Sequence, residues 1–168
     1  MTPPEVWLRG PLQGIPPLLQ PVAHSLLQCR EEVQRVLADL SAEQLRRRVG
    51  GAASAGYHIR HAIGSLDRLL TYARGETLTL AQLANLREED NADARFAADE
   101  LAADFDAAVD GALTQVASTP ESTLTESRLV GRAKLPSTVI GLLFHAAEHT
   151  QRHVGQLATT VKIVRAIP

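Results

Sequence analysis

The fold is decided by the segment "STVIGLLFHAAEHTQRHVGQLATTVK", residues 137–162, which contains no proline. Its apolar residues recur every three or four positions, the spacing that places them on one buried face of an α-helix. We therefore predict a single long helix that begins just after Pro136 and ends near Lys162. The residues that should face the core are Val139, Leu143, Ala146, Val154, Leu157 and Val161.

Three other segments carry the same periodicity and should pack against this helix. The first begins at Pro21, a residue that suits a first helical turn. Gly50 and Gly51 interrupt the helical pattern after it. The second should run from Ser54 to Gly75, and the third should begin near Asp93. Their predicted inward residues are Val22, Leu26, Cys29, Val33, Val36 and Leu40; Ile59, Ala62, Leu66, Leu69 and Ala73; and Ala97, Leu101, Phe105, Ala108, Ala112 and Val116. Four long amphipathic helices predict an all-α protein, a four-helix bundle with long crossover connections.

The remaining segments divide the chain into an arm and one domain. Residues 1–17 carry five of the nine prolines, which predicts an extended N-terminal arm laid on a domain formed by residues 18–168. A short helix capped by Thr79 should precede an acidic turn. The polar connection over residues 118–136 contains only "RLV" as a hint of a strand.

Composition excludes several classes of function. The net charge of −2 and the pI near 6.3 leave "LRRR", residues 45–48, as the only dense basic run, so we expect no nucleic-acid partner. No stretch approaches the roughly 20 apolar residues of a membrane span. Cys29 is the only cysteine, which fits a reducing cytoplasm. We expect a cytoplasmic protein that acts on a small molecule and forms a homodimer.

Histidines are concentrated on two of the predicted helices. His145, His149 and His153 stand four residues apart, and the facing segment "YHIRHAIGS" adds His58 and His61. An i,i+4 pair can present two imidazoles to one ion, and a third imidazole from a facing helix leaves coordination positions open for water or substrate. The alternatives without a metal are a solvent-exposed row of histidines or histidines whose hydrogen bonds are satisfied within the core.

A competing motif overlaps the same row. "HAAEH", residues 145–149, has the H-x-x-E-H spacing of inverted zinc proteases, in which Glu148 would be the general base. Such a site needs a further ligand, yet the residues after His149 include no Asp, Glu or Cys. Glu148 should also point away from the inward face, so we do not favour this interpretation.

Two motifs resemble those of the DinB/YfiT-like superfamily of bacterial four-helix-bundle metalloproteins. "HAIGS", residues 61–65, and "HTQRHVGQ", residues 149–156, match the family's second and last helices, and the resemblance spans about Pro21 to Lys162. It implies that His61, His149 and His153 are the metal ligands, and it leaves His58 and His145 outside. Gly64 stands where many members have Asp, so a supporting carboxylate at that position is missing.

The resemblance also implies a class of chemistry. The family's three histidines hold Zn²⁺, Ni²⁺, Fe²⁺ or a similar divalent ion, and some members transfer groups to or from low-molecular-weight thiols such as bacillithiol and mycothiol. We therefore predict a metal-dependent transferase or hydrolase. The transferase would use a low-molecular-weight thiol as cosubstrate, and Gln156 and Ser65 would orient the substrate or cosubstrate. The alternatives are a non-catalytic metal-binding or stress-response protein and a structural oligomer with an incidental histidine stripe.

Overall fold

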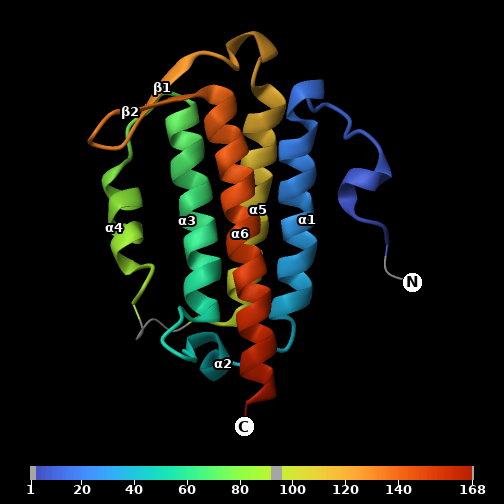
Figure 1. Ribbon diagram of the computed structural model, residues 1–168, viewed down its shortest axis with the longest axis vertical. Coiled ribbons are helices and arrows are strands. Elements are labelled where there is room, and N and C mark those ends of the chain that lie inside the picture. The colour runs from blue at the N-terminus through green and yellow to red at the C-terminus, as the bar shows by residue number, and fades with distance from the viewer. Residues whose placement is uncertain (1–2, 92–95, 168) are drawn as a thin grey trace.

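Four long helices form a bundle in the computed structural model, which describes residues 3–91 and 96–167 (Figure 1). These helices are α1 (Gln20–Leu37), α3 (Ala55–Ala73), α5 (Ala98–Ser118) and α6 (Val139–Ala166). The prediction of an all-α four-helix bundle is confirmed. The start of the third long helix was expected near Asp93, which lies outside the described residues.

Because of the way the helices are arranged, one connection must run along the full length of the bundle. Helix α6 packs between α3 and α1, and α5 closes the ring by packing on α1 and α3. Helices α3 and α5 run in the same direction, so the chain returns between them along the outside of α3 (Figure 1). This return contains α4 (Leu80–Glu88), the predicted short helix, whose N-cap is Thr79.

The other connections stay at the ends of the bundle. A short helix that the sequence did not predict, α2 (Ala42–Arg46), lies between α1 and α3 and contains part of the basic run. Between α5 and α6, β1 (Ser127–Val130) and β2 (Leu135–Thr138) form an antiparallel hairpin. The hint of a strand in "RLV" is thus confirmed. Its partner strand was hidden by Pro136, which a two-stranded ribbon tolerates because both strands are edges.

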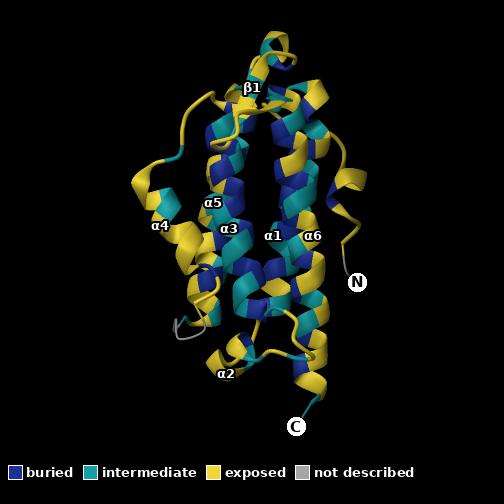
Figure 2. Ribbon diagram, turned by 60° about the vertical axis from the view of Figure 1, so that its left-hand side comes forward, coloured by how far each residue is buried: buried dark blue, intermediate teal, exposed yellow. Residues whose placement is uncertain are grey.

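The predicted apolar faces meet in the centre of the bundle, as the buried faces in Figure 2 show. Almost all the predicted inward residues are buried, and Val36, Leu69 and Ala108 are partly buried. Ala97 is a correction, because it is exposed and precedes the first turn of α5 as its N-cap. Val109, which was not predicted, is fully buried on α5 instead.

The N-terminal arm is held against α1 by polar contacts. It is not extended throughout, because Val6–Arg9 forms one 3₁₀ turn in which Val6 is buried. Arg9 donates two hydrogen bonds to the Glu31 carboxylate, at 2.5 and 2.8 Å. His24 of α1 also contacts the arm, because its Nε2 lies 3.1 Å from the carbonyl oxygen of Gly10. None of the described helices is long and apolar enough to cross a membrane.

Candidate metal centre

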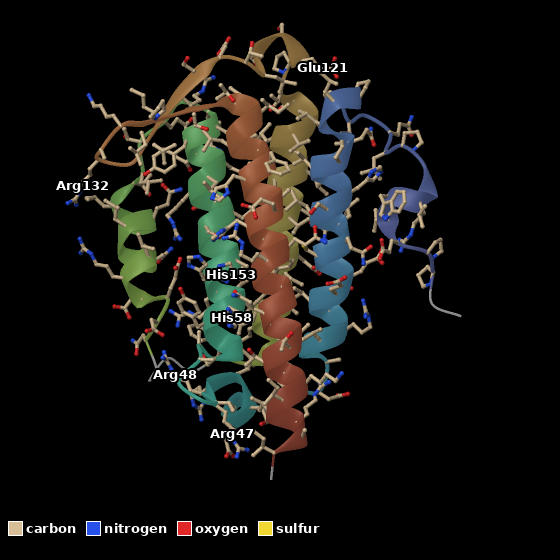
Figure 3. All side chains as sticks on the ribbon, viewed as in Figure 1. Arg47, Arg48, His58, Glu121, Arg132 and His153 are labelled. Atoms are coloured by element: carbon tan, nitrogen blue, oxygen red, sulfur yellow. The ribbon has the colours of Figure 1, made fainter. Side chains whose placement is uncertain are left out.

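The three histidines named by the sequence motifs converge where α3 and α6 pack together. Each of His61, His149 and His153 offers a ring nitrogen that lies within 4.8 Å of those of the other two. Figure 3 labels His153 on α6 and His58 on α3, and these two labels show where along the two helices the cluster lies. Among the described residues, this is the group of His, Cys, Asp and Glu side chains whose geometry could hold a metal ion.

Local structure fixes the α3 side of the cluster. The Ser54 hydroxyl accepts a hydrogen bond from the backbone N–H of Tyr57, and this cap sets where α3 begins. His58 and His61 then stand three residues apart, so both can face α6. The Tyr57 ring stacks on the His61 imidazole, with ring centroids 5.4 Å apart and an interplanar angle of 12°. Tyr57 therefore restricts the tilt of His61.

The distance between two of the ligand atoms fits a shared ion. His61 Nε2 lies 3.0 Å from His149 Nε2. Two nitrogens bound to one cation at about 2.1 Å, with an angle of 90° to 109° between the bonds, stand about 3.0–3.4 Å apart. The His153 ring completes the group, with its centroid 4.4 Å from that of His61 and 4.7 Å from that of His149.

The electrostatics of the cluster favour neutral imidazoles. Burial lowers the pKa of His153 to about 4, and repulsion from His61 and His149 adds to the effect. The pKa of His149 is lowered as well, first by burial and then by the neighbouring His61. Both rings are thus neutral at pH 7, which is the form that binds a metal ion.

His58 supports the cluster from outside the group of three. It is buried, and its Nδ1 lies 3.3 Å from Nδ1 of His153, within hydrogen-bond distance. That contact occupies Nδ1 of His153 and leaves its Nε2 available to bind a metal ion. Burial also lowers the pKa of His58, so this imidazole can accept a hydrogen bond from His153.

The acidic residue of the H-x-x-E-H motif is engaged elsewhere. Glu148 Oε1 lies 2.7 Å from Nδ1 of the exposed His145, and both oxygens of Glu148 accept hydrogen bonds from Arg152. His145 lies outside the group of three that could hold an ion. The structure therefore offers no support for the inverted-protease interpretation.

A carboxylate that sequence reasoning missed contacts the cluster from α4. Glu89 directly follows this helix, and its Oε2 accepts a hydrogen bond from His61 Nδ1 at 2.7 Å. Its Oε1 accepts one from Arg68 at 2.6 Å. Burial alone would raise the pKa of Glu89, but the hydrogen bonds from His61 and Arg68 outweigh burial and lower it. No local spacing signals this contact, because Glu89 is 28 residues from His61.

The two residues predicted to orient a substrate or cosubstrate differ in their surroundings. Ser65 is buried, and its hydroxyl donates a hydrogen bond to the carbonyl oxygen of Ala62. Gln156 is exposed on α6. Their roles in binding stay predictions. In the candidate metal centre itself, the buried Nδ1 of His149 makes no hydrogen bond with any of the described residues.

Comparison with known proteins identifies the family of the chain. A crystal structure described as the conserved protein of locus from Enterococcus faecalis superposes with a TM-score of 0.73 at 16% identity. The match covers 89% of this chain and 98% of that chain, and at this identity it shows the fold alone. No curated protein matches the chain. The sequence profile of the DinB superfamily matches residues 25–157, a range that includes His61, His149 and His153, and the chain therefore belongs to the DinB superfamily.

Proposed function

We propose that this protein is a divalent-metal-dependent enzyme in which His61, His149 and His153 hold the ion. The observation that carries the proposal is the convergence of three imidazole nitrogens within 4.8 Å. Burial lowers the pKa of both His149 and His153, which favours the neutral imidazoles that such an ion requires. Three imidazoles suit Zn²⁺, Ni²⁺ and Fe²⁺ alike. An ion held there would lower the pKa of a bound thiol or water and so supply a nucleophile at neutral pH.

The side chains around the cluster favour thiol transfer over hydrolysis. Even where an ion activates the water, hydrolysis also requires a proton to reach the leaving group, and a positioned acid or base usually transfers it. The two acidic residues that approach the histidines among the described residues already have partners: Glu89 is bonded to His61 and Arg68, and Glu148 to Arg152. A thiol activated by the ion needs no such base. We therefore place the transferase ahead of the hydrolase.

The thiol would come from a cosubstrate. Cys29, the only cysteine of the chain, is buried on α1. Burial raises its pKa to about 12, so it carries almost no thiolate at neutral pH. A low-molecular-weight thiol is thus the proposed cosubstrate. A cytoplasmic location and a homodimer remain part of the proposal.

Metal analysis of protein purified without a histidine tag tests the ligand assignment. We expect wild-type protein to hold a divalent ion, and His149→Ala and His153→Ala to lose it. His145→Ala is the matched control, because this residue lies on the same helix one turn before His149 but outside the group of three. Equal metal content in all four proteins would refute the assignment.

An activity panel separates the enzyme from a second candidate. Low-molecular-weight thiols would be incubated with a generic electrophile, with and without a chelator, and conjugation would be followed. Metal-dependent conjugation that His153→Ala abolishes supports the transferase. Both carboxylates that the described part of the chain brings near the histidines already have partners, which also fits a non-catalytic metal-binding protein. Metal retention without conjugation across the panel would favour that alternative.

A further inference from the structure

The end of α4 carries a buried carboxylate on an otherwise exposed helix. All residues of α4 are described, and none of them is buried. Glu89, the next residue, is only 6% exposed. Removing a carboxylate from water is unfavourable unless it is paired and hydrogen-bonded. The position of Glu89 therefore requires partners inside the bundle.

Each of the two carboxylate oxygens of Glu89 has its own partner. Arg68 donates to Oε1 at 2.6 Å, and the arginine is itself buried. Its positive charge balances the carboxylate. The second oxygen, Oε2, remains for His61 Nδ1 at 2.7 Å. Both partners lie on α3, so one side chain from the α3–α5 connection reaches the face of α3 that carries the candidate ligand.

Gly64 leaves the space into which the carboxylate fits. It lies one turn after His61 on α3. A Cβ atom at this position would stand 2.3 Å from Glu89 Oε1 and 2.7 Å from Arg68 Nη1. Both distances are too short for an ordinary contact, so a side chain at position 64 would force the ends of Glu89 and Arg68 to shift from their observed places. The sequence of α3 is matched to a carboxylate that arrives from another segment.

The contact with Glu89 determines which nitrogen of His61 carries the proton. An ionised carboxylate can only accept a hydrogen bond, so His61 Nδ1 must donate. The lone pair of the neutral ring then resides on Nε2, the atom that lies 3.0 Å from His149 Nε2. We propose that Glu89 is a positioning residue that fixes the tautomer and orientation of His61 so that Nε2 can bind the metal ion. The involvement of an ion rests on the proposed function, whereas the choice of tautomer does not.

The tautomer of His61 can be measured in the metal-free wild-type protein by long-range ¹H–¹⁵N NMR correlations. We expect the Nδ1–H form. In Glu89→Gln the single amide oxygen should stay with Arg68, which is a donor only, so the amide NH₂ would face His61 Nδ1 and the ring should switch to the Nε2–H form. An Nε2–H tautomer in the wild type, or no change in the variant, would overturn the proposal.

Zn²⁺ affinity, measured by competition with a chromophoric chelator, is the second readout. Loss of a carboxylate that orients a ligand histidine typically reduces metal affinity about 10- to 100-fold, and we expect this range for Glu89→Gln. Glu88→Gln is the matched control, because it removes the same charge one residue earlier from a carboxylate bonded to Asn91. Equal affinity in the two variants would contradict the role of Glu89. If the wild type binds no Zn²⁺, the proposed function fails, and the NMR measurement still decides what Glu89 does.

Discussion

Replacing Gly64 by alanine is predicted to destabilise the protein, against the usual trend for a helix. A glycine inside a helix is about 1 kcal/mol less favourable than alanine, so most such replacements stabilise. At position 64 the new methyl group would overlap Glu89 Oε1 and displace the carboxylate from Arg68 and His61. Removing one partner of a buried ion pair destabilises by roughly 3–5 kcal/mol, and this is the upper limit here because both partners remain and only their ends must shift. Subtracting the helix gain leaves a net loss of at most roughly 2–4 kcal/mol.

Thermal unfolding of metal-free protein in a chelator provides the assay. For a chain of 168 residues, each 1 kcal/mol corresponds to roughly 2–4 °C in Tm. Gly64→Ala should therefore lower Tm, by no more than about 16 °C. Gly111→Ala is the matched control, because Gly111 lies inside α5 and a Cβ there would meet nothing within 4 Å. We expect it to raise Tm by a few degrees. An equal rise in both variants would show that the fit between Gly64 and Glu89 carries no energy.

Three further predictions concern the histidines and the helix that presents them. The stability of the metal-free protein should fall as the pH decreases from about 6.5 to 4, because unfolded histidine binds a proton in this range whereas folded His153, with a pKa of about 4, does not. Denaturation with urea across this range should show a loss of about 2–3 kcal/mol from His153, and a flatter profile in His153→Phe. Zn²⁺ at about 100 times its Kd should stabilise the wild type by about 2.7 kcal/mol, and a melt of His149→Ala that shifts equally would contradict the ligand assignment. Ser54→Ala should destabilise by about 1 kcal/mol through loss of the α3 cap, as measured by urea denaturation, and an unchanged midpoint would exclude that role for the cap.

The helices and most of the core could be predicted because the periodicity of apolar residues is a local property. Val22, Leu66 and Leu143 are buried where this pattern places them. The same logic failed at Ala97, because periodicity continues past the point where the backbone leaves the helix. Helix α2 was missed for a different reason. Its five residues are too few to show a repeat, although Ser41 and Gln44 form a capping box at its start.

The candidate site was predictable to the extent that it depends on positions within one helix. His149 and His153 are four residues apart, so helix geometry alone places them on one face, and the family resemblance singled out His61 rather than His58. The partner contacts of these rings were not predictable. Whether His58 reaches His153, and whether any carboxylate reaches His61, depends on how α3 packs against α6 and α4.

The topology of the bundle explains why the missing carboxylate comes from α4. Because α3 and α5 run in the same direction, the chain must return along the bundle between them, and it does so beside α3 (Figure 1). The return is held near its start by Gln82, whose amide donates to Asp67 and Thr71 on α3. It ends next to the turn of α3 that carries His61, where Glu89 makes its contacts. A connection that the fold requires for purely topological reasons thus delivers a carboxylate to the ligand, and Gly64 on α3 leaves it the necessary space. The burial of Glu89 and the glycine at position 64 are thus explained together, although the two residues belong to different segments of the chain.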